Sequence, residues 1–339
     1  MLNTDTASRV TGPRRFARGA FADLERLARR KRQAGTTVTV ILPARQVAET
    51  IGTVLTELSA LRRPVEADAV PLVDQVVVVA SDGDDGTADI ARGFDAEVYL
   101  ESDLMPGYGP NLGKGDALWR GLSVAEGDLV AFADTDSRDF RPELVAGILG
   151  PMLTDPGIRF TKGAFRRPFA RHDVVDEDAG GRVTEIAAKP LLNVFFPELA
   201  GFAQPLAGEF AGHRSLLRSL PFVTGYGVDV GLLIDAAARG GVASLAEVDL
   251  GGRINRHQSL TALSRMGYAV ARTILDRAGT RSGAAGRFIG DGSAYTRFVH
   301  AAATPRGLLT TTYHEPLIER PPLDTLGPEG PQPVVARVR

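Results

Sequence analysis

The stretch Thr37-Val-Thr-Val-Ile-Leu42, which runs into Pro43, decides the fold class. It is rich in β-branched residues and mostly apolar, which is typical of a strand buried on both faces of a sheet. Apolar side chains then recur at helical spacing over Glu49–Arg62, and Gln75–Ala80 is a second apolar run. Because strand, helix and strand alternate, this segment predicts a parallel sheet covered by helices on both faces.

The same alternation continues along the chain. Further strands are predicted at Ala96–Leu100, Asp128–Ala133, Ile158–Ala164 and Ala243–Leu250. Further helices are predicted from Thr87 and over Gly115–Val124, Val183–Phe196, Val228–Arg239 and Ser259–Ala278. The sequence therefore predicts an α/β protein with a mainly parallel central sheet.

Changes in composition and in hydrophobic pattern divide the chain into segments. We expect an N-terminal helical arm at 1–35, a central α/β domain at 36–258 with halves at 36–136 and 137–258, a C-terminal helical region at 259–315, and a tail at 316–339. The tail is rich in proline and glycine from Pro316 onward, so we expect it to be poorly ordered.

The N-terminal arm contains a basic segment, Arg14–Arg32, in which Phe16, Phe21, Leu24 and Leu27 recur at helical spacing. One interpretation is an arm that binds a membrane surface or a nucleic acid. The alternative, which we favour, is a helix that docks its apolar side on the domain and leaves its basic face in solvent.

Composition excludes several classes of protein. The 339 residues are 44% hydrophobic and 24% charged, and no stretch approaches the ~20 apolar residues that span a bilayer. The N-terminal residues lack the apolar core of a secretory signal, so we expect a cytoplasmic protein. The absence of cysteine excludes disulfides and thiolate chemistry. A net charge of −2 argues against nucleic-acid binding.

Lysine is scarce, since four lysines stand against 35 arginines among the 39 basic residues. One of them lies in Gly113-Lys114-Gly115, which opens a predicted helix. Backbone N–H groups at a helix start, together with one ammonium, form an anion site. The other interpretation is a tight turn before a helix; we favour phosphate binding.

Asp134-Thr135-Asp136 follows the apolar strand Leu129–Ala133 directly. Two carboxylates at a strand end can hold a hard divalent cation, with coordination positions left for a diphosphate. Ligands of parallel sheets bind beyond the carboxyl ends of the strands. That rule selects Pro43–Ala48, Ser81–Asp85 and Asp134–Asp136 as the region of the site.

Two later segments carry polar groups at helix starts. Gly180-Gly-Arg-Val-Thr184 offers a guanidinium and a hydroxyl, which suit a second anion, although a capped helix explains them equally well. Tyr226 and Asp229 could hydrogen-bond a sugar or cap the helix that follows.

His257, in the polar segment Gly251–Gln258, could complete a metal shell, although a lone histidine is more often structural.

Taken together, these blocks resemble the glucosyl-3-phosphoglycerate synthases, which are retaining glycosyltransferases of the GT-A (Rossmann-like) fold, and the related mannosyl-3-phosphoglycerate synthases. The likeness runs from about Thr36 to Arg320. It is carried by Leu42-Pro-Ala44, Gly113-Lys-Gly-Asp-Ala-Leu-Trp-Arg120, Asp134-Thr-Asp136, Arg166-Arg-Pro168, Gly180-Gly-Arg-Val-Thr-Glu185, Gln204-Pro-Leu-Ala-Gly-Glu209, Leu220-Pro-Phe222, Gly225-Tyr-Gly-Val-Asp229 and Arg320-Pro-Pro322.

The resemblance implies a nucleotide-sugar half at 36–136 and an acceptor half at 137–258. It implies transfer of a hexose from a nucleoside diphosphate sugar to 3-phosphoglycerate, which gives a precursor of a compatible solute. The implied catalytic residues are Lys114, Asp136 and Asp229. The implied donor-binding residues are Pro43, Ala44, Ser81, Lys114, Asp134, Thr135, Asp136, Tyr226 and Asp229.

The resemblance also implies an acceptor site and a metal site. The acceptor would meet Gly181, Arg182, Val183, Thr184 and Asn255. A Mg²⁺ or Mn²⁺ ion would be held by Asp136 and by a histidine of the late loop. The family's histidine aligns with Asn255, so either His257 replaces it or Asn255 is a weaker ligand.

Two further departures concern the nucleoside. Where the family has a carboxylate near the ribose, this chain has Val47, and where the family has an aspartate after the second strand it has Ala80. We therefore favour GDP-mannose slightly over UDP-glucose as the donor, with GDP-glucose as a third candidate. We also expect a homodimer that binds neither nucleic acid nor membrane. A transferase acting on a lipid phosphate and a non-catalytic sugar-nucleotide sensor are the alternative classes.

Overall fold

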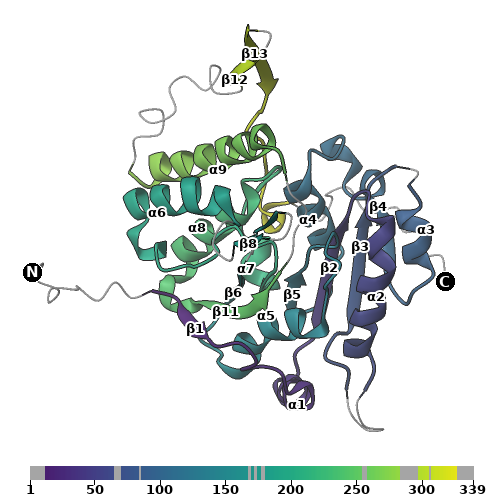
Figure 1. Ribbon diagram of the computed structural model, residues 1–339. Helices are drawn as coiled ribbons and strands as arrows, with labels where there is room; N and C mark the ends of the chain where they lie inside the picture. Colours follow the sequence, from purple (N-terminus) through teal and green to yellow (C-terminus); the bar gives the residue numbers. More distant parts are fainter. Residues whose placement is uncertain are drawn as a thin grey trace, which may run out of the picture.

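The computed structural model describes residues 12–64, 70–83, 85–166, 169–171, 174–176, 180–253, 258–282, 297–304 and 307–326. Its described part is built on one large sheet with helices against both faces, and a two-stranded hairpin projects from one side (Figure 1). This confirms the α/β fold class expected from the sequence.

The large sheet has eight strands among the described residues, in the order β1-β11-β6-β9-β5-β2-β3-β4. All neighbouring strands are parallel except β9, which runs antiparallel to both β5 and β6. Their bounds are β1 (Arg14–Phe16), β2 (Val38–Ala44), β3 (Gln75–Ala80), β4 (Glu97–Leu100), β5 (Leu129–Phe132), β6 (Phe160–Arg166), β9 (Phe210–His213) and β11 (Leu245–Gly252).

Helices form the two outer layers because the central strands are apolar on both faces. One buried cluster includes Val38, Val40 and Leu42 on one side of β2, and the other includes Ile41 on the opposite side. The first cluster is covered by α1 (Leu24–Ala34), α2 (Ala48–Arg62), α3 (Thr87–Arg92) and α5 (Pro142–Thr154). The second is covered by α4 (Lys114–Ser123), α6 (Lys189–Phe195), α7 (Arg214–Arg218), α8 (Val228–Gly240) and α9 (Leu260–Arg281).

Shorter elements complete the described chain. They are the strands β7 (Phe169–Arg171), β8 (Val174–Asp176) and β10 (Phe222–Val223), the 3-10 turns η1 (Glu101–Asp103), η2 (Pro106–Tyr108), η4 (Pro197–Leu199), η5 (Val242–Ser244) and η7 (Leu323–Thr325), and the single π-helical turn η3 (Thr184–Ala188). None of the described helices is both long and apolar enough to cross a bilayer.

The strand order reverses beside β2. The chain moves from β2 to β3 and β4 on one side, and then returns to place β5 on the other side of β2. Such a reversal opens a crevice at the carboxyl ends of the two strands. Those ends carry Pro43–Ala44 and Asp134–Asp136, so the fold brings together segments selected from the sequence.

The prediction of one helix over Arg14–Arg32 is wrong in its first half. Arg14–Phe16 forms the edge strand β1, which pairs in parallel with Ala246–Val248 of β11. The helix begins only at Leu24, after Asp23 accepts a hydrogen bond from the N–H of Arg26. The apolar residues Phe16 and Phe21 pack against each other, with ring centroids 5.1 Å apart. Much of the basic segment is thus part of the domain.

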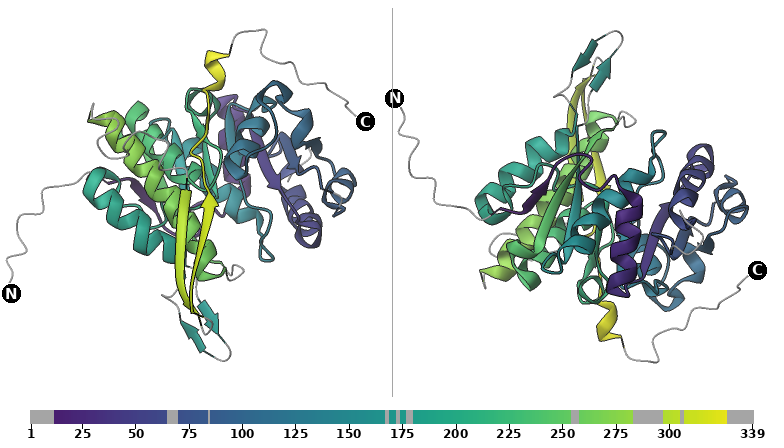
Figure 2. Two further views of the ribbon diagram at one scale, coloured as in Figure 1. Left: turned by 90° about the horizontal axis from the view of Figure 1, so that it is seen from above. Right: turned by 90° about the horizontal axis from the view of Figure 1, so that it is seen from below.

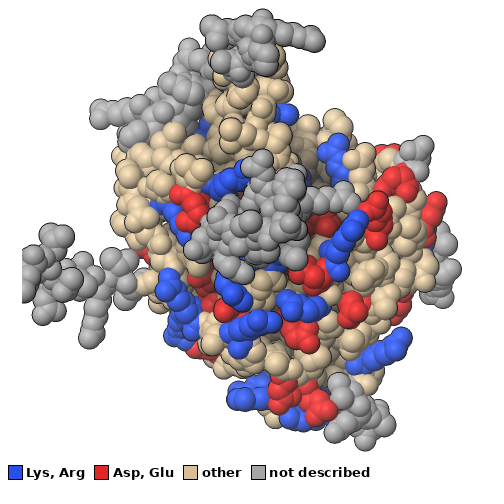
Figure 3. Space-filling view, in the orientation of Figure 1, with Lys and Arg blue, Asp and Glu red and all other residues tan. Residues whose placement is uncertain are grey.

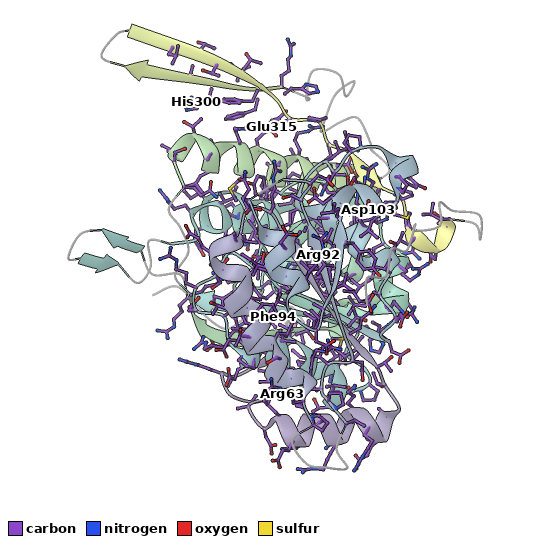
Figure 4. All side chains as sticks on the ribbon, turned by 90° about the vertical axis from the view of Figure 1, so that its right-hand side faces the viewer. Arg63, Arg92, Phe94, Asp103, His300 and Glu315 are labelled. Atoms are coloured by element: carbon purple, nitrogen blue, oxygen red, sulfur yellow. The ribbon has the colours of Figure 1, made fainter. Side chains whose placement is uncertain are left out.

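The prediction of a helical C-terminal region at 259–315 is also wrong in part, because α9 ends at Arg281 and the described residues 297–304 and 307–314 are strands. β12 (Arg297–Thr304) and β13 (Gly307–His314) pair with each other in antiparallel orientation and make up the hairpin. The hairpin packs on α9 through Tyr268 and Phe298, whose ring centroids lie 5.5 Å apart, and runs across its outer side (Figure 2). Figure 4 shows His300 on this hairpin and Glu315 at its base.

The tail is ordered where it returns to the domain. Glu319–Arg320 forms β14, which pairs with β10, and both Arg320 and Leu323 are buried. The expectation of disorder from Pro316 is therefore wrong through residue 326, and residues 327–339 lie outside the described part of the chain.

Candidate active site

The loop after β5 is fixed by hydroxyl groups from both sides. Thr135 Oγ1 donates to the carbonyl of Pro43 at 2.6 Å, and Thr50 Oγ1 donates to the carbonyl of Thr135 at 2.6 Å. Thr135 is buried, whereas the side chain of Asp136 is 62% exposed. The loop thus holds Asp136 in a fixed backbone position while its carboxylate faces solvent.

Lys114 lies at the first position of α4, where Gly113 has a φ of 121° that favours glycine. Its Nζ is 2.7 Å from Asp134 Oδ1 and 3.7 Å from Asp229 Oδ2. Burial alone lowers the pKa of Lys114, but the two carboxylates outweigh it and raise that pKa overall. The ammonium is therefore charged at neutral pH.

Gly208 lies directly against this ion pair. A Cβ at Gly208 would meet Asp134 Oδ2 at 2.3 Å and Lys114 Nζ at 2.5 Å. Such distances leave no room for a side chain, so the backbone of the Gln204–Glu209 segment approaches the pair closely. Glycine at this position is a requirement of the site's geometry.

Arg253 and Glu209 belong to the same cluster, and neither was selected from the sequence as a site residue. Both are almost fully buried and form an ion pair. Arg253 Nη2 is also 3.5 Å from Asp136 Oδ1, and Nη1 is 3.9 Å from Asp134 Oδ2. The sequence contained grounds for selecting both residues, because Glu209 ends one of the family's blocks and Arg253 lies in the polar segment Gly251–Gln258.

Pro43, Ala44 and Ser81 lie at the carboxyl ends of β2 and β3. The carbonyl of Ala44 accepts the N–H of Ser81 at 3.0 Å, which ties the ends of β2 and β3 together. Val47 is 8% exposed and packs in the apolar core, and Ala80 is fully buried. The two positions that depart from the family are thus apolar and covered.

Tyr226 and Asp229 lie at the start of α8. Asp229 is buried in the first turn of this helix, and its carboxylate approaches Lys114. Tyr226 is 51% exposed. The structure therefore brings Asp229 into the cluster and leaves the ring of Tyr226 largely accessible to solvent.

The residues expected to bind the acceptor form a second group, at the start of η3. Gly181 has a φ of 67°, Arg182 and Val183 are half-buried, and Thr184 is buried. A cleft of about 420 Å³ opens beside them, with Gly180, Lys189 and Gln204 in its lining. Asn255 and His257 lie outside the described residues.

The carboxylates fit a hard divalent cation in part. Asp134 and Asp136 supply the oxygen ligands that Mg²⁺ and Mn²⁺ prefer, and the exposed carboxylate of Asp136 can accept one. Within the part of the chain that the structure describes, no three His, Asp or Glu side chains gather closely enough to hold an ion. Figure 3 shows acidic and basic side chains interspersed on one face rather than one basic patch.

A strand-end Asp-x-Asp and a helix-start lysine in the crevice of a mainly parallel sheet define a nucleotide-sugar-dependent glycosyltransferase of the GT-A type. No family model matches the chain. The chain is 39% identical over 298 residues to the glucosyl-3-phosphoglycerate synthase of Mycolicibacterium smegmatis, covering 87% of this chain and 92% of that protein.

Solved structures agree with this class. A mannosyl-3-phosphoglycerate synthase from Rubrobacter xylanophilus superposes with a TM-score of 0.83 at 50% identity, over 92% of this chain and 97% of that chain. A glucosyl-3-phosphoglycerate synthase from Mycobacterium tuberculosis, in complex with Mn²⁺, UDP-glucose and phosphoglyceric acid, superposes with a TM-score of 0.75 at 35% identity, over 91% and 98%. The chain belongs to the family of glucosyl- and mannosyl-3-phosphoglycerate synthases and is a hexosyltransferase.

Proposed function

We propose that this enzyme transfers a hexose from a nucleoside diphosphate sugar to 3-phospho-D-glycerate with retention of anomeric configuration. The observation that carries the proposal is the ion pair of Lys114 and Asp134 beside the exposed Asp136, at the carboxyl edge of the sheet. The relative from M. tuberculosis, which binds UDP-glucose and phosphoglyceric acid, supports the same pair of substrate classes.

The donor occupies the crevice between β2 and β5. Lys114 binds the diphosphate, with the backbone at Pro43, Ala44 and Ser81 along the nucleoside. Asp229 and Tyr226 hydrogen-bond the sugar. Because the ammonium of Lys114 has Asp134 and Asp229 as partners before substrate arrives, it is already oriented, and little reorganisation accompanies binding.

A Mg²⁺ or Mn²⁺ ion would be held by Asp136 together with His257 or Asn255. When bound, it supplies Lewis-acid stabilisation of the leaving diphosphate. Arg253, which lies 3.5 Å from Asp136, restrains this carboxylate from the buried side.

The acceptor meets Gly181, Arg182, Val183, Thr184 and Asn255. A guanidinium pairs bidentately with a phosphate or a carboxylate, and 3-phosphoglycerate carries both groups. The acceptor hydroxyl attacks the anomeric carbon on the face that the diphosphate leaves. The bond from this carbon to the diphosphate breaks, the new glycosidic bond forms, and the hydroxyl proton passes to the leaving diphosphate.

We favour GDP-mannose as the donor, with UDP-glucose as the alternative and GDP-glucose as a third candidate. Val47 and Ala80 offer no carboxylate to a ribose or a uracil, and a buried site rewards only the base whose polar edges it satisfies. The higher identity to a mannosyl-3-phosphoglycerate synthase, 50% against 35%, supports mannose. The double variant Val47→Glu, Ala80→Asp should move the kcat/KM ratio toward UDP-glucose.

We also propose a homodimer, formed through the hairpin side of the molecule. Val299 and Leu309 on the hairpin are both 57% exposed, and Ile186 and Val194 on η3 and α6 are 74% and 70% exposed. The hairpin, η3 and α6 each contact α9, and exposed apolar patches are typical of protein interfaces. Val299→Asp together with Leu309→Asp should convert a dimer into a monomer in light scattering.

The proposed function is tested by incubating the enzyme and Mn²⁺ with each sugar nucleotide, with and without 3-phosphoglycerate. Mass spectrometry of a hexosyl-3-phosphoglycerate and release of GDP or UDP would support it. Nucleotide binding without product would instead indicate a sensor, and activity that needs a lipid phosphate would indicate the other transferase class.

A further inference from the structure

Lys162 lies in the middle of β6 and is fully buried. Lysine is almost never buried to this extent unless its charge is partnered, because transfer of an ammonium from water is costly. In the sheet, Lys162 stands beside Glu247 of β11 and Phe210 of β9. An apolar residue at this position would fill the space without that cost, so the ammonium needs an explanation.

The contacts of Lys162 lead to the donor site. Its Nζ donates a hydrogen bond to the backbone carbonyl of Asp229 at 3.1 Å, and it lies 5.3 Å from the centroid of the Phe210 ring. Glu247 directs its two carboxylate oxygens to the N–H groups of Ala203 and Gln204, both at 3.0 Å. The hydrogen bond of Lys162 thus goes to the first turn of α8.

That turn carries the carboxylate of Asp229, which lies 3.7 Å from Lys114 Nζ. Asp229 is therefore restrained twice, at its backbone by one lysine and at its side chain by another. A shift of its carbonyl would rotate the first turn of α8 and move the carboxylate away from Lys114. Misplacement of a substrate-positioning group by about 1 Å can cost about 100-fold in rate.

We propose that Lys162 is a positioning residue for the donor site, which holds the first turn of α8 so that Asp229 meets Lys114 and the donor sugar. The proposal rests on the proposed function for its kinetic readout. Lys162 touches neither substrate in this arrangement, so it acts through Asp229.

The electrostatic environment makes this restraint sensitive to pH. Burial lowers the pKa of Lys162 to about 8. The charged groups that face it are Asp229 on α8, Glu247 on β11, Lys114 on α4 and Asp134 after β5. Because a lowered lysine pKa means that the charge is lost as the pH rises through about 8, the restraint is strongest below that pH and weakens above it.

The experiment compares Lys162→Met with Lys31→Met. Lys31 is also buried, and its Nζ donates to the carbonyl of Pro71 at 2.8 Å and to Asp74 at 2.6 Å, away from the donor site. Both variants remove a buried ammonium, and the unfolding temperature of each variant measures what this removal does to the stability of the fold. Only Lys162→Met should alter the donor site.

For Lys162→Met, we expect donor kcat/KM to fall by about tenfold or more, with the acceptor KM unchanged. The fall of donor kcat/KM above pH 8 in the wild type should disappear in Lys162→Met and remain in Lys31→Met. Lys162→Arg, which keeps the charge, should recover part of the loss. Unchanged donor kcat/KM, or an equal loss in Lys31→Met, would overturn the proposal.

A crystal structure of Lys162→Met gives a readout that does not depend on the reaction. The turn at Val228–Asp229 should be displaced relative to the wild-type protein, and a superposable turn would overturn the proposal. If the wild type forms no product with any donor, the proposed function fails, and the position of this turn still decides the role of Lys162.

Discussion

Arg320 and Asp116 form a buried ion pair although 204 residues separate them along the chain. Asp116 is fully buried in α4, two residues after Lys114, and Arg320 lies in the short strand β14. Arg320 Nε donates to Asp116 Oδ1 at 2.8 Å, and Asp116 Oδ2 accepts the N–H of Leu112 at 3.0 Å. The C-terminal segment therefore holds the start of the helix that presents Lys114 to the donor.

Replacing Arg320 should destabilise the protein and loosen the donor site. Asp116 would remain buried with Arg120, whose Nε lies 3.2 Å away, as its remaining cationic partner. Breaking a buried pair by removing one member typically costs about 3–5 kcal/mol, and the remaining Arg120 should keep Arg320→Ala near the lower end. Chemical denaturation measures this loss in the free energy of unfolding. In the same variant, the donor KM should rise while the acceptor KM stays constant.

The control for this prediction is Arg29→Ala. Arg29 and Glu25 form an exposed pair at 3.7 Å on α1, with side chains 54% and 49% exposed. Exposed pairs of this kind contribute about 0.3–0.5 kcal/mol. Equal losses in Arg320→Ala and Arg29→Ala would show that the buried pair does not stabilise the fold.

Gly208→Ala should damage the site through one methyl group. The new Cβ would overlap Asp134 Oδ2 and Lys114 Nζ, so the ion pair must separate or the backbone must move. Overpacking of this kind costs about 1–3 kcal/mol, and donor kcat/KM should fall by about tenfold or more. At Gly252 a Cβ meets nothing within 4 Å, so Gly252→Ala should retain wild-type kinetics.

Asp136→Ala tests the metal-binding residue. Its side chain is 62% exposed, so the variant should keep the wild-type unfolding temperature while turnover falls by about 100-fold or more. Excess EDTA should abolish wild-type activity, and Mn²⁺ should restore it. Asp95→Ala, which removes a carboxylate that is 91% exposed, should stay fully active. Full activity of Asp136→Ala would exclude this residue as a ligand.

The order of strands and helices in the first half could be predicted from the sequence because each strand there is apolar and ends at a turn. β2, β3 and β4 agree with the predicted ranges to within a residue or two. The antiparallel strand β9 was missed, because its four residues Phe210–His213 include a glycine and a histidine and give no strand pattern. Its position depends on pairing with β5 and β6, which is information from distant parts of the chain.

The residues of the candidate site, too, could be predicted only where the local sequence indicates their position. Lys114, Asp134 and Asp136 could be selected because short motifs at strand and helix ends place them, and Asp229 because a family block contains it. Lys162 could not be selected from the sequence, because the pattern of its strand is that of an ordinary core segment. Only the fold shows that its ammonium reaches α8. The edge strand β1 could not be predicted for a related reason. The spacing of the apolar residues around it indicated a helix, and only the fold shows that Arg14–Phe16 pairs with β11.

Arg182→Ala separates the acceptor site from the donor site. Arg182 lies at the start of η3, on a different element from Lys114 and Asp136, so its loss should leave donor binding intact. A charge-assisted bidentate pair is worth about 1.5–3 kcal/mol, and about 1.4 kcal/mol corresponds to a tenfold change. The KM for 3-phosphoglycerate should therefore rise by about one to two orders of magnitude, while the affinity for the sugar nucleotide measured by calorimetry should stay constant. Arg92→Ala, which removes an arginine that is 48% exposed on α3, should change neither quantity. If Arg182→Ala weakens donor and acceptor equally, Arg182 binds the nucleotide sugar or supports the whole fold, and the acceptor lies elsewhere.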